Sequence, residues 1–220
     1  MKFTALLPMK GESERVPNKN IREFNGIPLC KHVLETLREV DQIDKIIINT
    51  DSDQIIDLAS SYEKVIFHKR PNSLLGHFVP MNDIIAYDIE KSGDEFFIQT
   101  HSTNPLIKAK TISEALINFE KEKSQFDSFF SVTRIQTRLY WGDGTPINHN
   151  PQELLRTQDL SPVYEENSNF FIFSKSSFKN AGNKRIGVNP KMVEVNQLEA
   201  LDIDELEDFL LAEAAQKIIK

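Results

Sequence analysis

The chain has 220 residues, of which 40% are hydrophobic and 27% charged, and its formal net charge is -7. This length and composition fit one globular domain with a sizeable core. Because the chain is acidic and lacks a basic tract, nucleic acid is not an expected partner. No apolar run reaches the roughly 20 residues of a membrane span, and no signal-peptide core is evident, so we expect a cytoplasmic protein without membrane contact. Cys30 is the single cysteine, which excludes an internal disulfide and a cysteine-based metal cluster.

Apolar patterning predicts an α/β fold. Short β-branched or aromatic runs, typical of buried strands, alternate with longer segments whose apolar residues recur at helical spacing. This alternation predicts a mostly parallel, doubly wound sheet of Rossmann-like type that binds ligands at the carboxyl ends of its strands. The predicted strands are residues 3–7, 44–51, 65–67, 95–100 and 127–133, and the predicted helices are residues 28–40, 53–61, 78–91 and 110–123.

The pattern changes after residue 134. The segment Tyr140–Pro146 is rich in turn residues, with Gly-Asp-Gly after two aromatic residues, which predicts a hairpin that leaves the main sheet. The core resumes at Asn169–Phe173, and a last helix is predicted from about Ile203 to Lys217. We therefore predict a single domain over residues 1–220, in which residues about 134–167 form a protruding arm for dimerisation or for substrate.

The segment from Phe3 to Asn20 carries the clearest functional signal. It begins as an apolar strand, breaks at Pro8 and continues as a polar loop. Two common phosphate-binding patterns, G-x-x-x-x-G-K-[ST] and G-x-G-x-x-G, are absent from it. The region is nevertheless locally positive in an acidic chain, which favours an anion such as a triphosphate. From Lys2 to Arg22 the cations are Lys2, Lys10, Arg15, Lys19 and Arg22, against the anions Glu12 and Glu14.

This loop resembles the nucleotide-binding signature of the acylneuraminate cytidylyltransferase family, roughly P-A-R-G-G-S-K-R-x-P-x-K-N, which follows the first strand of a nucleotidyltransferase fold. A surface loop with scattered charges is the alternative. Three positions depart from the family, because Lys10 stands in place of Arg, Glu12 in place of Gly and Glu14 in place of Lys. The matching positions are Pro8, Gly11, Ser13, Arg15, Pro17, Lys19 and Asn20; apart from Pro17, the resemblance assigns them, together with Lys10, to nucleotide binding.

Polar residues also follow the second and third predicted strands. The run Asn49–Asp53 is similar to the family's S-T-D-S, which implies that it shapes the nucleotide end of the pocket. Asp51 also suits the cap of the next helix, and we favour that interpretation over direct catalysis. Arg70 precedes Pro71 in a match to the family's R-P, which implies a contact with the base. Met81 stands where the family has a small hydroxyl residue, which leaves cytosine recognition open.

The fourth predicted strand is followed by a match to the family's Q-P-T-S-P-L. His101 occupies the Gln position, and Gln99 could serve there only after a local shift. A neutral imidazole can donate or accept one hydrogen bond at each nitrogen, so His101 could still contact a base or a sugar. A strand-end histidine satisfied by the backbone is the structural alternative. In the same motif, Thr103 is implied as a substrate-binding residue.

A further match begins at Arg156 and resembles the family's R-x-Q followed by P-x-x-Y-x-x-N-G, with Ser168 in place of the Gly. This region is implied to hold the acceptor sugar acid. The planar fork of Arg156 suits a carboxylate, because it can bind both oxygens, whereas a surface ion pair is the alternative. The implied acceptor residues are Arg156, Gln158, Tyr164 and Asn167.

The last match, around residues 201–213, resembles the family's D-I-D-x-x-x-D-F. It implies that Asp202 and Asp204 hold Mg²⁺, a hard cation that commonly takes one or two carboxylates together with phosphate oxygens and water. Acidic residues at the start of a helix also cap it and complement its dipole. Position and spacing favour the metal here.

Together the motifs imply that a hydroxyl of a 2-keto, sialic-acid-like sugar acid attacks the α-phosphorus of CTP, giving a CMP-sugar and pyrophosphate with Mg²⁺ as cofactor. Such CMP-sugars serve surface polysaccharide biosynthesis. The arm of the family carries its dimer contact, so the resemblance implies a homodimer. A transferase for another nucleotide or acceptor and a non-catalytic nucleotide-binding member are the alternatives, suggested by Lys10, Glu14, Met81 and His101. The catalytic residues implied are Lys19, Arg15, Asp202 and Asp204, which would neutralise charge and align the reactants.

Overall fold

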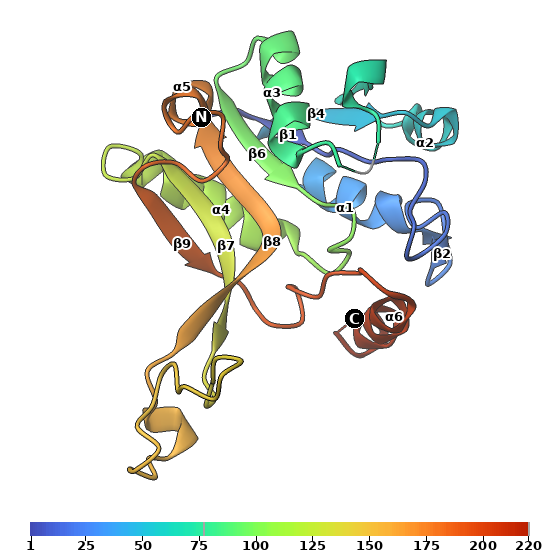
Figure 1. Cartoon of the computed structure of the whole chain (residues 1–220). Coiled ribbons are helices and arrows are strands. Elements are labelled where there is room, and N and C mark those ends of the chain that lie inside the picture. Colours follow the sequence, from blue (N-terminus) through green and yellow to red (C-terminus); the bar gives the residue numbers. More distant parts are fainter. Residues whose placement is uncertain (77, 220) are drawn as a thin grey trace.

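The computed structural model describes residues 1–76 and 78–219. Within them, the chain forms a seven-stranded sheet and a small hairpin of β2 (Glu23–Phe24) and β3 (Ile27–Pro28) (Figure 1). The sheet strands are β1 (Phe3–Leu6), β4 (Ile43–Thr50), β5 (Val65–Lys69), β6 (Phe96–Thr100), β7 (Ser128–Ile135), β8 (Val163–Ser174) and β9 (Pro190–Glu194). The α-helices are α1 (Leu29–Arg38), α2 (Asp53–Ala59), α3 (Met81–Ser92), α4 (Ala109–Glu122), α5 (Lys175–Asn180) and α6 (Leu206–Ile219).

The order of the strands is β5-β4-β1-β6-β8-β7-β9. β1 pairs in parallel with β4 on one side and with β6 on the other, and β4 pairs in parallel with β5. The chain thus runs outward from β1 to β5 and then returns to the far side of β1. β8 is antiparallel to both β6 and β7, whereas β9 is parallel to β7. The predicted doubly wound, mostly parallel sheet is confirmed, and its topological switch point lies between β1 and β6, where such folds bind ligands.

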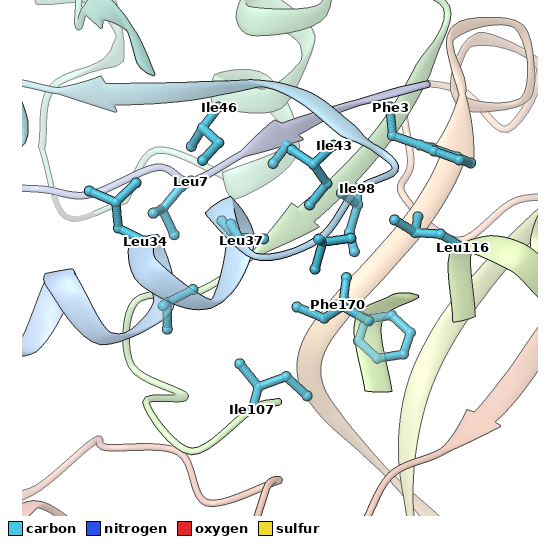
Figure 2. Close-up of a cluster of buried hydrophobic side chains, with 14 of the residues drawn as sticks. Phe3, Leu7, Leu34, Leu37, Ile43, Ile46, Ile98, Ile107, Leu116 and Phe170 are labelled. Carbon is cyan, nitrogen blue, oxygen red and sulfur yellow. The ribbon is translucent and has the colours of Figure 1, made fainter. Parts of the chain in front are cut away.

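Helices cover both faces because successive strand residues point to opposite sides of the sheet. Ile98 and Ile172 belong to one apolar cluster, which includes residues of α1 and α4, and this cluster is shown in Figure 2. Their neighbours Phe97 and Phe171 belong to a second cluster, with residues of α3 and α5. Cys30 lies in the first cluster, and burial raises the pKa of its thiol to about 11, as expected of a structural cysteine. Among the described helices, none has the length and apolar character that a membrane crossing needs.

Several boundaries differ from the sequence-based prediction. α3 begins at Met81 and not at residue 78, because Val79 precedes Pro80 and a residue before proline is disfavoured in helical conformation. β8 has 12 residues and begins well before Asn169. α5 and β9 were not predicted, since each is too short to show a clear period. α6 begins at Leu206, so the segment with Asp202 and Asp204 precedes the helix as irregular chain.

The predicted arm is formed by the ends of β7 and β8, which remain paired from Val132–Glu166 to Ile135–Val163, and by the connection between them. It protrudes from the body of the molecule (Figure 1). The turn-rich segment closes as a hairpin, with a bridge between Tyr140 and Pro146. The arm carries exposed apolar side chains, among which Trp141 is 63% and Leu154 92% exposed. Its role in dimerisation stays a prediction.

Candidate active site

A cleft of about 400 Å³ opens at the carboxyl ends of β1 and β6, at the switch point of the sheet. A second hollow of about 420 Å³ adjoins it and shares Lys10, Arg70 and Gly76 with it. The N-terminal loop, the connection between β5 and α3, the end of β6 and the segment before α6 all contribute to the walls. The polar and charged residues of the main cleft are Lys10, Ser13, Arg15, Lys19, Asn20, Arg70, His101, Ser102, Thr103, Ser168, Asp202 and Asp204.

Buried hydrogen bonds hold the N-terminal loop against the sheet. The amide of Asn20 donates to the carbonyl oxygen of Lys10 over 2.8 Å, and its Oδ1 accepts from the hydroxyl of Ser102 over 2.6 Å. Asn20 therefore joins both ends of the loop to the segment after β6. Pro8, which also lines the cleft, places the break between strand and loop.

Gly11 is held on the other side of the loop by Asp51, whose Oδ1 accepts from the Gly11 amide over 2.7 Å. A Cβ at Gly11 would lie 2.9 Å from the Cβ of Ser52, so only glycine fits this close approach. The expectation that Asp51 caps α2 is wrong, because Ser52 is the N-cap and its hydroxyl accepts from the amide of Ile55. Asp51 instead fixes the loop.

The basic loop and the acidic segment before α6 meet across the cleft. Arg15 Nη2 lies 2.6 Å from Asp204 Oδ1, and Lys19 Nζ donates to the carbonyl oxygen of Ile203 over 2.6 Å. Lys19 Nζ is also 3.8 Å from Asp204. Burial lowers the pKa of Lys19, and the charges of Asp204 and Asp202 oppose this effect. The structure thus brings together the four residues that the sequence analysis named as catalytic.

The carboxylate of Asp202 lines the cleft. Its Oδ1 is buried and has no hydrogen-bond partner in the described part of the chain. Burial raises the pKa of Asp202, while a hydrogen bond from Thr103 acts in the opposite direction. Within the described residues, no group of three or more His, Cys, Asp or Glu side chains is placed to hold a metal ion. Asp202 and Asp204 both line the cleft, and their carboxylates are the kind of ligand that Mg²⁺ takes, commonly one or two together with phosphate oxygens and water.

Arg70 lies at the other end of the cleft and is held by Asn49. Its Nε donates to Asn49 Oδ1 over 2.8 Å, and its Nη2 donates to the Asn49 carbonyl oxygen over 3.0 Å. Burial lowers the pKa of Arg70, and the carboxylates of Asp51 and Asp88 oppose this shift. Met81 also lines the cleft. Asn49 therefore orients the Arg70 guanidinium, which lines the cleft and is accessible to a ligand there.

His101, and not Gln99, faces the cleft. Gln99 is fully buried, donates to the carbonyl oxygen of Thr100 and accepts from Arg185, so its amide is committed inside the protein. His101 lines the cleft, with Nε2 3.5 Å from Arg185 Nη1. Burial, assisted by the charges of Arg185 and Lys19, lowers the pKa of His101 to about 3. The ring is therefore neutral near pH 7, and it can offer Nδ1–H to a ligand while Nε2 faces Arg185.

Sequence reasoning missed Arg185, which lies between α5 and β9. Its guanidinium carbon is 4.1 Å from the ring centroid of Phe171, and its Nε donates to Asn82 over 3.2 Å. No motif surrounds it, and its position depends on packing between distant segments. The only possible signal was an arginine in a segment that had no assigned element.

The predicted acceptor residues are divided between the cleft and the arm. Arg156 lies in the arm and makes an exposed bidentate pair with Asp159, at 2.7 and 3.0 Å. Gln158 lies in the short 3-10 helix Thr157–Asp159, which begins directly after Arg156, and Tyr164 pairs with Arg134 in the arm. None of the three lines the main cleft as the described residues form it, and their role in binding the acceptor stays a prediction.

Asn167 and Thr103, in contrast, lie beside the candidate site. Asn167 is buried, donates to the Thr133 hydroxyl over 2.9 Å and lines a hollow of about 490 Å³. This hollow shares Ser168, Asp202 and Asp204 with the main cleft. Ser168 adopts a φ of 57°, a left-handed conformation that favours glycine. This backbone explains why the related signature has Gly at that position.

Glu12 and Glu14, the two acidic residues at which the loop differs from the family signature, lie in different places. Glu12 lines the second hollow and not the main cleft. Glu14 is exposed, and neither hollow includes it, although Ser13 and Arg15 on either side of it line the main cleft.

The fold and this site define a nucleotide-binding α/β protein with cations and carboxylates on opposite sides of one cleft. The sequence model of the cytidylyltransferase family matches residues 4–217. The chain therefore belongs to the cytidylyltransferase family, which confirms the resemblance read from its motifs.

Known relatives agree with this assignment. The chain is 27% identical over 234 residues to the CMP-N,N'-diacetyllegionaminic acid synthase of Legionella pneumophila, covering 99% of this chain and 97% of the relative. It is 25% identical over 183 residues to the pseudaminic acid cytidylyltransferase of Campylobacter jejuni, covering 78% of each chain. The structure of CMP:2-keto-3-deoxy-manno-octonic acid synthetase complexed with CTP covers all of this chain, with a TM-score of 0.72 at 12% identity. This last likeness shows the fold.

Proposed function

We propose that the protein transfers CMP from CTP to a hydroxyl group of a 2-keto sugar acid of the nonulosonic type. The observation that carries the proposal is the meeting of Arg15 and Lys19 with Asp204 at the switch point of the sheet. The cations suit a triphosphate and the carboxylates suit its counter-ion. The named activities of the relatives, on pseudaminic and diacetyllegionaminic acids, support the acceptor class. Because CTP is the donor, the reaction would take place in the cytoplasm.

In the proposed mechanism, the anomeric hydroxyl oxygen of the acid attacks the α-phosphorus of CTP. The new bond joins this oxygen to phosphorus, the bond from phosphorus to the α,β-bridging oxygen breaks, and pyrophosphate leaves with the electron pair. The hydroxyl proton passes to solvent. Lys19 and Arg15 bind the phosphates, so that the charge on the leaving group is neutralised where it develops. The held loop around Gly11 and Ser13 aligns the triphosphate, since this transfer depends mainly on position and charge.

Asp202 and Asp204 would hold Mg²⁺. When bound, the ion would reduce the negative charge of the α-phosphate and favour loss of the proton from the attacking hydroxyl. The buried, unpartnered Oδ1 of Asp202 supports this assignment. Asp204 is paired with Arg15, which would move to the phosphates as Asp204 turns to the cation.

The two ends of the cleft would receive different parts of the reactants. Arg70 would contact the cytosine base or its sugar, and the neutral ring of His101 would donate a hydrogen bond to the nucleotide. Thr103 and Asn167 lie on the side of the carboxylates, where the acceptor acid would enter. The arm, with Arg156, would belong to a homodimer interface and contact the acceptor from there.

The test is release of pyrophosphate by the purified protein in the presence of Mg²⁺. The common ribonucleoside triphosphates are each combined with a panel of 2-keto sugar acids. We expect release with CTP and with a nonulosonic acid, which would also identify the acceptor. If CTP gives no pyrophosphate release and another triphosphate raises the melting temperature, the proposal would be overturned in favour of a different nucleotide. Binding without turnover for any acid would favour a non-catalytic member.

A further inference from the structure

A buried carboxylate lies behind the cleft without taking part in the proposed chemistry. Asp88 of α3 is 0% exposed. Its Oδ1 accepts from His68 Nδ1 of β5 and from Asn49 Nδ2 of β4, each over 2.7 Å. Its Oδ2 is buried and lacks a hydrogen-bond partner among the described residues. Because an incompletely satisfied buried carboxylate is costly, the position of Asp88 calls for a role beyond packing.

Asn49 connects this carboxylate to the cleft. One end of its side-chain amide, Nδ2, donates to Asp88, and the other end, Oδ1, accepts from Arg70 Nε over 2.8 Å. The two ends of an amide are nearly equal in shape but opposite in hydrogen bonding. Because the Asp88 carboxylate accepts hydrogen bonds, it holds Nδ2 of Asn49 toward itself. Oδ1 of Asn49 therefore faces Arg70. If the amide turned around, it would present its N–H₂ group to a guanidinium that can only donate.

We propose that Asp88 is a positioning residue that acts through Asn49 to orient Arg70 toward the nucleotide. This inference rests on the proposed function, since it gives Arg70 a nucleotide to contact. Nε and one N–H of Nη2 are directed back to Asn49. The other N–H groups of the guanidinium have no partner among residues 1–76 and 78–219, and Arg70 lines both the main cleft and the second hollow. These hydrogen bonds connect Asp88, Asn49 and Arg70 in one chain, here called the relay. His68 supports it from β5.

If the relay is correct, variants at its three positions should share one effect, which is weaker binding of CTP. In Asp88→Asn, the new side chain can donate to Asn49, so the Asn49 amide is no longer held with Oδ1 toward Arg70. We expect CTP to bind about tenfold more weakly, which is the range for loss of one charge-assisted hydrogen bond. Asn49→Ala removes the acceptor itself and should weaken binding similarly. Arg70→Ala should weaken it at least as much.

A double-mutant cycle tests whether Asp88 acts through Arg70. The dissociation constant of CTP is measured by calorimetry with Mg²⁺ and without acceptor, for wild type, Asp88→Asn, Arg70→Ala and the double variant. If the relay holds, Asp88→Asn has no further effect once Arg70 is absent. Independent effects that multiply in the double variant would overturn the inference. So would an Arg70→Ala variant that binds CTP like wild type.

A matched control separates positioning from general destabilisation. Asp94 precedes β6 at the opposite end of the sheet and accepts from Thr4 over 2.8 Å and from Lys45 over 2.7 Å. Asp94→Asn should lower the melting temperature and leave the CTP dissociation constant unchanged. If Asp88→Asn does not fold, the same cycle is run with Asn49→Ala. Wild-type protein that fails to bind CTP would overturn the proposed function, whereas normal CTP binding with an additive cycle would overturn the relay alone.

Discussion

Arg15 and Asp204 form an ion pair across the cleft, with 2.6 Å between Nη2 and Oδ1. The two residues lie near opposite ends of the chain, and the fold brings them together at the switch point of the sheet. Each neutralises the other before substrates bind. In the proposed mechanism, Arg15 would bind the phosphates and Asp204 would bind the cation, so both residues would exchange this pair for other partners when the substrates bind. The pair therefore shows that the basic loop and the acidic segment before α6 line the same cleft.

Replacement of Asp204 tests this assignment. Asp204→Ala should reduce Mg²⁺-dependent pyrophosphate release by roughly 100-fold or more, because a ligand of the cation is lost. The fold should persist, since the side chains of Arg15 and Asp204 are both about half exposed and exposed ion pairs contribute little to the free energy of unfolding. Turnover and urea denaturation are measured on the same preparation.

Asp208 provides the matched control for this variant. Its Oδ2 accepts from the amides of Asp204 and Glu205 at the start of α6, at 3.1 and 2.8 Å. Asp208→Ala should cost about 1 kcal/mol of stability through the loss of this cap, and it should reduce turnover much less than Asp204→Ala does, because the carboxylate of Asp204 is retained. An Asp204→Ala variant with wild-type turnover would remove Asp204 from the metal site.

His101 should make stability depend on pH. Burial lowers its pKa from 6.5 to about 3, so between these values the unfolded chain binds a proton that the folded chain does not. The free energy of unfolding is therefore highest above the ordinary histidine pKa. It falls as pH decreases below that value, by up to about 2 kcal/mol at pH 5. His101→Gln should remove this loss. Chemical denaturation at about pH 7.5 and pH 5 compares the two proteins, and parallel pH dependences would show that His101 does not contribute.

Ser168 should be replaceable by glycine with a gain in stability. Its φ of 57° is strained for a residue with a Cβ, at a cost of about 1 kcal/mol. Ser168→Gly should raise the melting temperature by about 2–4 °C. Asn183→Gly, at a φ of 60°, is the control and should change little, because Asn tolerates this conformation. A melting temperature lowered by Ser168→Gly would show that the serine side chain stabilises the turn by other contacts.

The arm should mediate self-association. Light scattering should give a dimer mass for the wild type and a monomer mass for the double variant Trp141→Asp, Leu154→Asp, because charges would replace apolar surface that a second copy covers. Val188 is 75% exposed near β9, outside the arm, and Val188→Asp is the control that should remain dimeric. A wild-type monomer, or an unchanged dimer in the arm variant, would refute the predicted interface.

Much of the fold was predictable because local patterning and tertiary structure agree. β1 and β4 are short apolar runs, and α1 repeats its apolar residues at helical spacing, so their type follows from neighbours in sequence. Elements that lack such a pattern were missed. α5 has six residues and depends on the capping box of Ser174 and Ser177, and β9 exists because β7 offers a free edge for pairing.

The candidate site was predictable only in part. Lys19 and Asp204 belong to motifs, and the resemblance of these motifs to the family's signatures predicted a shared cleft. The role of Asp51 was not, because a carboxylate after a strand suits both a helix cap and a loop anchor, and the distance to Gly11 decides between them. Arg156 has the chemistry to bind a carboxylate, but the arm places it beside Asp159 and away from the main cleft.

The sequence by itself determined the family, the alternation of strands and helices, and the charged motifs that meet at the switch point, because each depends on residues close together in the chain. Tertiary structure alone decided that His101 faces the cleft while Gln99 is bound by Arg185. It also placed Asp88 behind Arg70 through Asn49. These arrangements depend on hydrogen bonds between segments far apart in sequence, whose geometry exists only once the sheet and its helices have packed.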